Sequence, residues 1–134
     1  MRPVKQYSDD IIPLQAIDDN DQSIDLTDYT KVDSLIYVKY RIKTKNNTGK
    51  WKKSTTITIS SPTTGDMLWE VPYEILETKK GVWECEIHAL KDLVYNTPLT
   101  KYEFIKGTSK ATKMPLEDND FFEIQINESA PVDV

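Results

Sequence analysis

The sequence has few of the residues that usually build metal and redox sites. It contains one cysteine, Cys85, and one histidine, His88, among 134 residues. A single cysteine excludes an intrachain disulfide and a thiolate metal cluster. Without a second histidine, a transition-metal site would have to consist mainly of carboxylates. We therefore expect no metal site and no cofactor.

Glycine is also scarce, and long apolar runs are absent. The four glycines, Gly49, Gly65, Gly81 and Gly107, lie too far apart to form a phosphate-binding loop. The amino terminus lacks the apolar run of a signal peptide, and no segment is apolar enough to span a membrane. We expect a protein that stays soluble inside a cell and has no membrane partner.

The charge balance is acidic but uneven. The net charge of −5 argues against general nucleic-acid binding, which requires a basic surface. The segment Lys39–Lys53 nevertheless carries seven basic residues and no acidic one, whereas Asp9–Asp28 and Glu117–Glu128 are strongly acidic. This segregation indicates either compensation within one molecule or contacts between neighbouring copies.

The stretch Gly65–Leu90 predicts the centre of the fold. Apolar residues at every second position line one face of a strand. Two such runs occur here, the first at Met67, Trp69 and Val71 and the second at Trp83, Cys85, Ile87 and Ala89. Between them, Pro72 donates no ladder hydrogen bond, and Gly81 offers the backbone freedom needed for the return. We expect two inward-facing strands joined by a turn region with a short helix.

Ser34–Thr44 predicts the clearest single strand, and Trp51–Ile59 predicts its return strand after an Asn–Gly hairpin turn. Alternation then gathers five basic side chains on the outer face: Lys39, Arg41, Lys43, Lys50 and Lys52. This basic face has two interpretations, a solvated surface that resists aggregation and a docking surface for an acidic partner. Its aromatic content, essentially Tyr37, gives little support for stacking of single-stranded nucleic acid.

Shorter patterns supply the remaining strands. Ile11–Ile17, Leu99–Ile105 and Phe121–Ile126 are predicted as strands and Asp92–Pro98 as a loop, whereas Gly107–Pro115 is a polar segment that we expect to be mobile. The predicted core consists mainly of aromatic and branched residues on the inward faces. Its members are Trp51, Trp69, Trp83, Cys85, Ile87, Val38, Tyr40, Phe104 and Phe122.

About seven or eight short strands separated by turn signals indicate an all-β fold, an antiparallel β-sandwich of the immunoglobulin-like type. The length suits one domain. We expect residues 10–127 to form the sandwich and residues 128–134 to form a flexible tail. Residues 1–9 form an N-terminal arm, in which Arg2–Tyr7 is either extended or a first edge strand.

Two patterns suggest chemistry, and each has a simpler explanation. The aspartate-rich segment 18–28 resembles a calcium loop, but it lacks the spacing, the glycine and the closing glutamate of the helix-loop-helix site. A solvated turn explains it better. Cys85 and His88 could act as nucleophile and base, but alternation places them on opposite strand faces, out of hydrogen-bond reach. Cys85 is better explained as a small core residue. We therefore expect no catalytic residues and no enzymatic activity.

Five segments occur in an order that is typical of one phage protein family: Ile24–Thr27, Thr64–Trp69, Gly81–Glu86, Pro115 and Phe122–Ile126. The order resembles the immunoglobulin-like amino-terminal domain of phage baseplate upper proteins and related tailed-phage virion modules. There, a V-D-L-T-G-A segment precedes a long strand, and an aromatic-x-x-I-x-I strand closes the domain. This chain differs at Asp28 and Tyr29, where the family often has glycine and alanine.

The resemblance implies a non-enzymatic virion protein whose immunoglobulin-like module docks onto other virion proteins, at the tail baseplate or on the head surface where fibres attach. In that family a helical connector and binding modules follow the domain. Their absence from this chain leads us to expect a free-standing adaptor or decoration protein. Its partners would be other virion proteins in a symmetric multi-copy assembly or homo-oligomer, in the virion and in the host cytoplasm during assembly. The alternative is a carbohydrate-binding sandwich whose exposed tryptophans stack on sugar rings.

Overall fold

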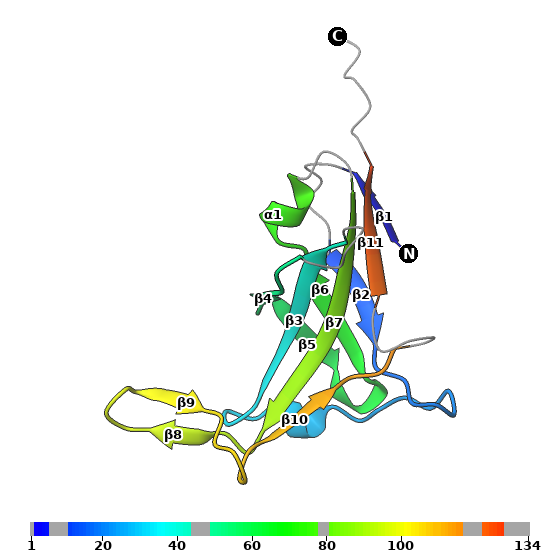
Figure 1. Ribbon diagram of the computed structural model, residues 1–134. Coiled ribbons are helices and arrows are strands. Elements are labelled where there is room, and N and C mark those ends of the chain that lie inside the picture. The colour runs from blue at the N-terminus through cyan, green and yellow to red at the C-terminus, as the bar shows by residue number, and fades with distance from the viewer. Residues whose placement is uncertain (1, 6–10, 44–48, 78–80, 117–121, 128–134) are drawn as a thin grey trace.

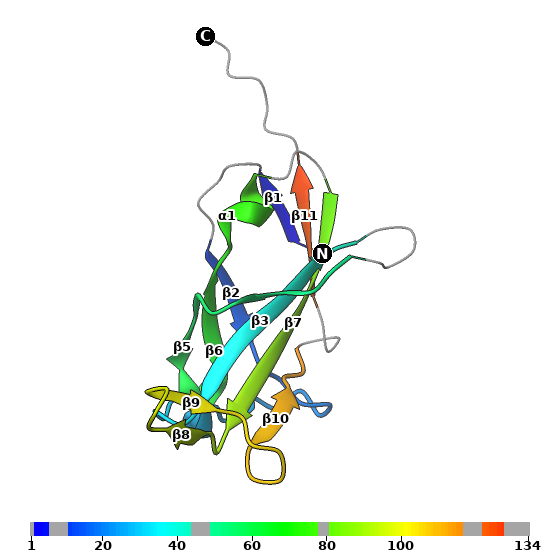
Figure 2. The same cartoon turned by 60° about the vertical axis from the view of Figure 1, so that its left-hand side comes forward.

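The structure is a computed structural model that describes residues 2–5, 11–43, 49–77, 81–116 and 122–127. These residues form several mainly antiparallel sheets with very little helix, so the predicted all-β class is confirmed. The two larger sheets face each other, as Figures 1 and 2 show from two directions. A small hairpin projects from one end of the molecule (Figure 1).

The larger sheet has six strands and contains the longest strands of the protein. Its order is β1 (Arg2–Lys5), β11 (Phe122–Asn127), β7 (Gly81–Lys91), β3 (Leu35–Ile42) and β4 (Lys52–Ser54). The sixth strand, β10 (Lys110–Lys113), pairs with the same edge of β7 as β11 does, but further along β7. Neighbouring strands are antiparallel except β1 and β11, which are parallel. Arg2–Lys5 therefore form an edge strand, one of the two predicted alternatives.

The smaller sheet has three strands in the order β2 (Ile11–Gln15), β6 (Asp66–Glu70) and β5 (Ile57–Ser61). Pro13 lies in the edge strand β2, where a missing N–H costs least. The projecting hairpin consists of β8 (Val94–Asn96) and β9 (Lys101–Glu103), which pair with each other in a separate two-stranded sheet.

Short helical turns connect the strands. These are the 3-10 helices η1 (Thr27–Tyr29) and η2 (Pro62–Thr64) and the α-helix α1 (Tyr73–Leu76). The predicted short helix after Pro72 is therefore confirmed, and its Ile75 and Leu76 are buried. Gly65 ends η2 with a left-handed φ of 72°. A Cβ there would lie 2.7 Å from the carbonyl oxygen of Ala16, so both the conformation and the space require glycine.

The core lies between the two sheets, and alternation explains its composition. Trp69 and Met67 of β6 are buried together with Val38 of β3 and Ile87 of β7. Of the predicted core, the structure buries six residues: Trp69, Trp83, Cys85, Ile87, Val38 and Tyr40. Segments outside the large strands close the edges of the core with Leu26, Ile75, Leu76 and Met114.

Two predicted core residues lie elsewhere. Phe104 is 46% exposed, because it follows β9 of the projecting hairpin and not a strand of either large sheet. Trp51 is only half-buried, because it precedes β4 at the edge of the larger sheet. The side chain of Phe122, the predicted hairpin turn at residues 46–48 and the predicted tail lie outside the described residues.

Three predicted segments also differ from the structure. The return strand Trp51–Ile59 is in fact two strands, because the chain leaves the larger sheet after Ser54 and joins the smaller sheet at Ile57. The predicted loop Asp92–Pro98 contains β8, and the polar segment Gly107–Pro115, expected to be mobile, contains β10. Both strands are short and mostly exposed, so they lack the apolar alternation that marks a strand in sequence.

Candidate functional site

The outer face of the larger sheet is the most developed polar surface among the described residues. Its centre is the antiparallel pair β3–β7, in which eight residues of β3 lie opposite eight of β7. The inner positions are apolar and buried, as the alternation predicts. At the outer positions, Tyr37 lies opposite His88, Lys39 opposite Glu86, and Arg41 opposite Glu84. Basic residues of one strand therefore face acidic residues of the next.

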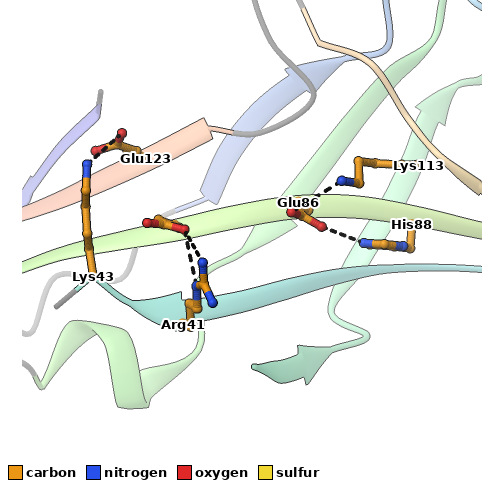
Figure 3. A network of polar contacts seen from close by, with 7 residues as sticks. Arg41, Lys43, Glu86, His88, Lys113 and Glu123 are labelled. Carbon is orange, nitrogen blue, oxygen red and sulfur yellow. Dashed lines mark hydrogen bonds and ion pairs between the residues drawn. The ribbon is translucent and has the colours of Figure 1, made fainter. Parts of the chain in front are cut away.

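Ion pairs connect four neighbouring strands across this face (Figure 3). Nη2 of Arg41 lies 3.2 Å from Oε2 of Glu84, and Nζ of Lys43 lies 3.5 Å from Oε1 of Glu123 on β11. On β7, Glu86 contacts His88 through Oε2 at 2.9 Å and Lys113 of β10 through Oε1 at 3.5 Å. Opposite charges at cross-strand positions stabilise a sheet, so the ion pairs brace this face.

Aromatic rings lie among these charges. The guanidinium carbon of Arg41 is 4.3 Å from the ring centre of Trp51, and Nζ of Lys53 is 4.3 Å from the ring centre of Tyr37. The rings of Tyr37 and His88 are stacked, with their centres 5.5 Å apart and their planes 12° apart. Cations over aromatic faces add attraction to the ion pairs. We refer to this outer surface of β3, β4, β7, β10 and β11 as the braced face.

The pKa of Glu86 reflects this arrangement. Partial burial raises the pKa of the Glu86 carboxyl, but the hydrogen bond with His88 and the charge of Lys113 outweigh burial, so the pKa is lowered overall. The carboxylate is thus the favoured form. A general acid needs a raised pKa, so Glu86 has the properties of a structural partner of its two neighbours.

The predicted basic docking set falls into two groups. Arg41 and Lys43 pair with glutamates of the braced face. Lys52 lies opposite the buried Tyr40 and pairs with Glu74 of α1, so its predicted place on the outer face was wrong; the lysine of β4 on that face is Lys53. The charge of Arg41, Lys43 and Lys52 is compensated within the molecule. Lys50 is exposed, and Lys39 is half-buried beside Glu86 and Lys53. Sequence reasoning could not find the compensation, because the glutamates of β7 lie more than forty positions further along the chain.

The lone cysteine and histidine lie on opposite faces of β7, as predicted. Cys85 is fully buried in the core, and burial raises the pKa of its thiol well above the usual value. His88 lies on the braced face. A thiol that is buried and protonated does not act as a nucleophile, so this pair does not form a catalytic dyad.

The aspartate-rich segment forms turns closed by its own carboxylates. Oδ1 of Asp18 accepts hydrogen bonds from the backbone N–H groups of Asn20 and Gln22, and Oδ1 of Asp25 accepts one from Thr27. Within the described part of the chain, no group of three or more His, Cys, Asp or Glu side chains is arranged to hold a metal ion.

A hollow of about 390 Å³ opens where the chain passes from β4 to β5. Its lining includes Tyr40, Thr56, Glu70, Val71 and Tyr73. The hydroxyl of Tyr40 donates a hydrogen bond to Oε2 of Glu74, and that of Thr56 donates one to the carbonyl oxygen of Glu70. The phenol of Tyr40 has its pKa raised to about 12 by burial and by the adjacent glutamate. These groups hydrogen-bond to one another or to the backbone, so we interpret the hollow as an open gap between the edges of the two sheets.

The β8–β9 hairpin is a feature that sequence reasoning missed. Leu99, Tyr102 and Phe104 were assigned to an ordinary strand, but in the structure they are exposed. The available signal was composition. Two short runs containing tyrosine, Val94–Asn96 and Lys101–Glu103, flank a polar segment with a proline, which is typical of a hairpin.

Comparison of the sequence with protein-family models and with curated proteins finds no match. No helix in the described residues is long and apolar enough to cross a membrane. The function must therefore be argued from the surfaces of this molecule.

Proposed function

We propose that the protein is a non-enzymatic structural adaptor of a tailed-phage virion. Its two sheets form an immunoglobulin-like module that docks onto other virion proteins, at the tail baseplate or on the head surface where fibres attach. The proposal combines the segment order that resembles the baseplate family with the character of the molecular surface. Its location would be the virion, and the host cytoplasm during assembly.

The observation that carries the proposal is the braced face. Its side chains are held by ion pairs and ring contacts on five strands of one sheet. A surface of fixed side chains loses little conformational entropy when it binds another protein. The mechanism is passive: a rigid module adds buried area at a joint between copies of its partners.

The carbohydrate-binding alternative finds no support in the positions of the tryptophans. A sugar platform needs an exposed aromatic face, but Trp69 is fully buried and Trp83 is only 6% exposed. The third tryptophan, Trp51, carries the guanidinium of Arg41 over its ring. Stacking of a sugar on that face of Trp51 would first require this cation to move.

The proposal is tested by labelling particles of a phage that encodes the chain. A tagged chain is expected to copurify with the particles and to place a gold label at one symmetric position in electron micrographs. Particles that carry no label would refute the virion assignment.

Charge reversal then tests the docking face separately. Lys39→Glu and Lys53→Glu change residues of the braced face and leave the ion pairs of Arg41, Lys43 and Lys52 in place, and they should reduce incorporation. Lys110→Glu is the matched control, because Lys110 lies on β10 of the same sheet opposite Lys91, so alternation turns it to the other face of the sheet. If all three variants are incorporated as well as the wild type, the face is wrong although the virion assignment stands.

A further inference from the structure

The β8–β9 hairpin carries a concentration of exposed apolar side chains. We refer to residues 93–105 as the apolar arm. It projects away from the two large sheets (Figure 1). Six of its large hydrophobic residues are between 37% and 55% exposed: Val94, Tyr95, Leu99, Tyr102, Phe104 and Ile105. This is more than half of the large hydrophobic residues that are exposed in the described part of the chain.

The apolar arm is well ordered at its root. The buried hydroxyl of Ser109 accepts a hydrogen bond from the backbone N–H of Ile105 and donates one to the carbonyl oxygen of Asp92. One side chain therefore holds both ends of the hairpin. The N–H of Leu93 also donates to the carbonyl oxygen of Asp33, which ties the arm to the segment before β3. The arm is thus presented in one orientation.

The arm is nevertheless incomplete as an isolated unit. A two-stranded hairpin in water is marginally stable unless further strands or a packed face support it. Tyr95 and Tyr102 lie directly opposite each other, with ring centres 5.0 Å apart, and form an aromatic surface on one side. In the described residues, β8 and β9 pair only with each other, so both outer edges can accept another strand.

The exposed apolar area of the arm is large enough for a protein–protein interface of standard size. Side chains of this size present about 170 Å² on average when fully exposed, so the six residues together leave about 450 Å² in water, counted over both sides of the hairpin. About 57% of a typical interface is nonpolar. An interface that covers both sides of the hairpin and so buries all of this apolar area would bury about 800 Å² per partner, the size of a standard interface.

The distribution of charge makes the arm the place where a second copy of this chain meets the least repulsion. The whole molecule carries a net charge of −5, so two copies repel each other at most orientations. The arm contains one lysine, Lys101, and one glutamate, Glu103, whose charged groups lie 4.0 Å apart. The arm is thus neutral. Because the arm projects, two copies that pair through it keep the rest of their acidic surfaces apart, and salt screens the remaining repulsion.

We propose that the apolar arm is a self-association surface, through which two copies pair about a twofold axis with the same patch on each side. The two hairpins bury their tyrosine faces or edges against each other. This inference does not depend on the virion assignment, since it concerns contacts between copies of the chain alone.

Sedimentation velocity of the full chain over a range of concentrations tests the proposal. The wild type is expected to show a reversible monomer–dimer equilibrium. Leu99→Asp in the arm should weaken the dimer about tenfold or more, as for a central apolar contact. The matched control is Leu68→Asp, because Leu68 is also exposed but lies on β6 of the smaller sheet. It should leave the equilibrium unchanged.

A wild type that stays monomeric at the highest concentration would overturn the proposal and assign the arm to a different protein. Equal weakening by Leu99→Asp and Leu68→Asp would also overturn it. A second measurement does not depend on the folding of the aspartate variants. Because Cys85 is buried, Thr97→Cys places the one accessible thiol of the described residues in the arm. A thiol-specific cross-linker with a spacer should then give a covalent dimer in the arm variant, and a monomer would contradict pairing through the arm.

Discussion

The two buried tryptophans differ in one respect that predicts different effects of the same substitution. In Trp69, the indole Nε1 donates a hydrogen bond of 3.1 Å to Oγ of Ser54. In Trp83, the indole Nε1 is buried and has no hydrogen-bond partner among the described residues. Replacement of either residue by phenylalanine removes the same atoms from the core. The shared loss of volume largely cancels when the two variants are compared.

The remaining difference has a magnitude that can be worked out. Trp69→Phe loses a hydrogen bond, which contributes about 1 kcal/mol to stability. Trp83→Phe removes a buried donor without a partner, which relieves a penalty of about 1–3 kcal/mol. Trp69→Phe should therefore destabilise the protein by about 2–4 kcal/mol more than Trp83→Phe does. Trp83→Ala, which empties the site, should cost about 3–5 kcal/mol.

Urea unfolding followed by far-ultraviolet circular dichroism measures these differences, because the signal does not depend on the tryptophans being replaced. The free energy of unfolding is obtained by linear extrapolation for the wild type and each variant. Equal destabilisation by the two phenylalanine variants would refute the reasoning. A Trp83→Ala variant that loses less than about 1 kcal/mol would show that this residue is not part of the core.

Three further outcomes are expected. Leu26→Ala should lower the free energy of unfolding by about 2–5 kcal/mol, because Leu26 is fully buried in the core; a loss within error would contradict that placement. The folded-state pKa of Glu86 lies below its ordinary value of 4.5, because the contacts to His88 and a lysine outweigh burial. Its contribution to stability is thus present above pH 4.5 and lost as the pH falls through the lowered pKa. Glu86→Gln should therefore make the free energy of unfolding less dependent on pH below 4.5. An unchanged slope would count against the contacts of Glu86 with His88 and Lys113. Burial and Glu74 raise the pKa of Tyr40 from 10.0 to about 12, so its contribution is present below pH 10 and lost as the pH rises through 12. Tyr40→Phe should reduce the loss of stability in that window, as measured by thermal unfolding, and a steeper loss would disprove it.

The parts of the fold that sequence could predict are those in which the signal is local. Alternation in β3 and β7 identified the inner residues, because burial on one face imposes a period of two on a strand. Pro72 correctly marked the end of β6 and the start of a helical turn. In these segments the pattern and the packing agree.

The parts that could not be predicted depend on pairing between distant segments. Nothing local in Trp51–Ile59 marks the change of sheet. At that point Ser54 is buried, and its hydroxyl accepts a hydrogen bond from the indole of Trp69. The polar strand β10 exists through its backbone bonds to β7. Conversely, Tyr102 and Phe104 alternate as core residues do but lie in the apolar arm.

The candidate site shows the same division. The basic residues Lys39 and Arg41 of β3 could be located from sequence, since alternation places them on the outer face. On β4 the prediction placed Lys52 there, whereas the structure places Lys53 there. The compensation of basic residues by Glu84 of β7 and Glu74 of α1 could not be predicted, because it arises only when distant elements meet. The predicted basic surface is thus a surface of paired charges.

The most direct test of the account is the exposure of the three tryptophans, because the account requires Trp69 and Trp83 to lie between the sheets. Acrylamide quenching of tryptophan fluorescence in the folded protein measures that exposure, and Trp51→Phe removes the half-buried residue. The account predicts that the readily quenched component disappears in this variant and that the remaining emission is protected. Strong quenching of the two remaining tryptophans would contradict the packed core and indicate an open aromatic surface for a ligand.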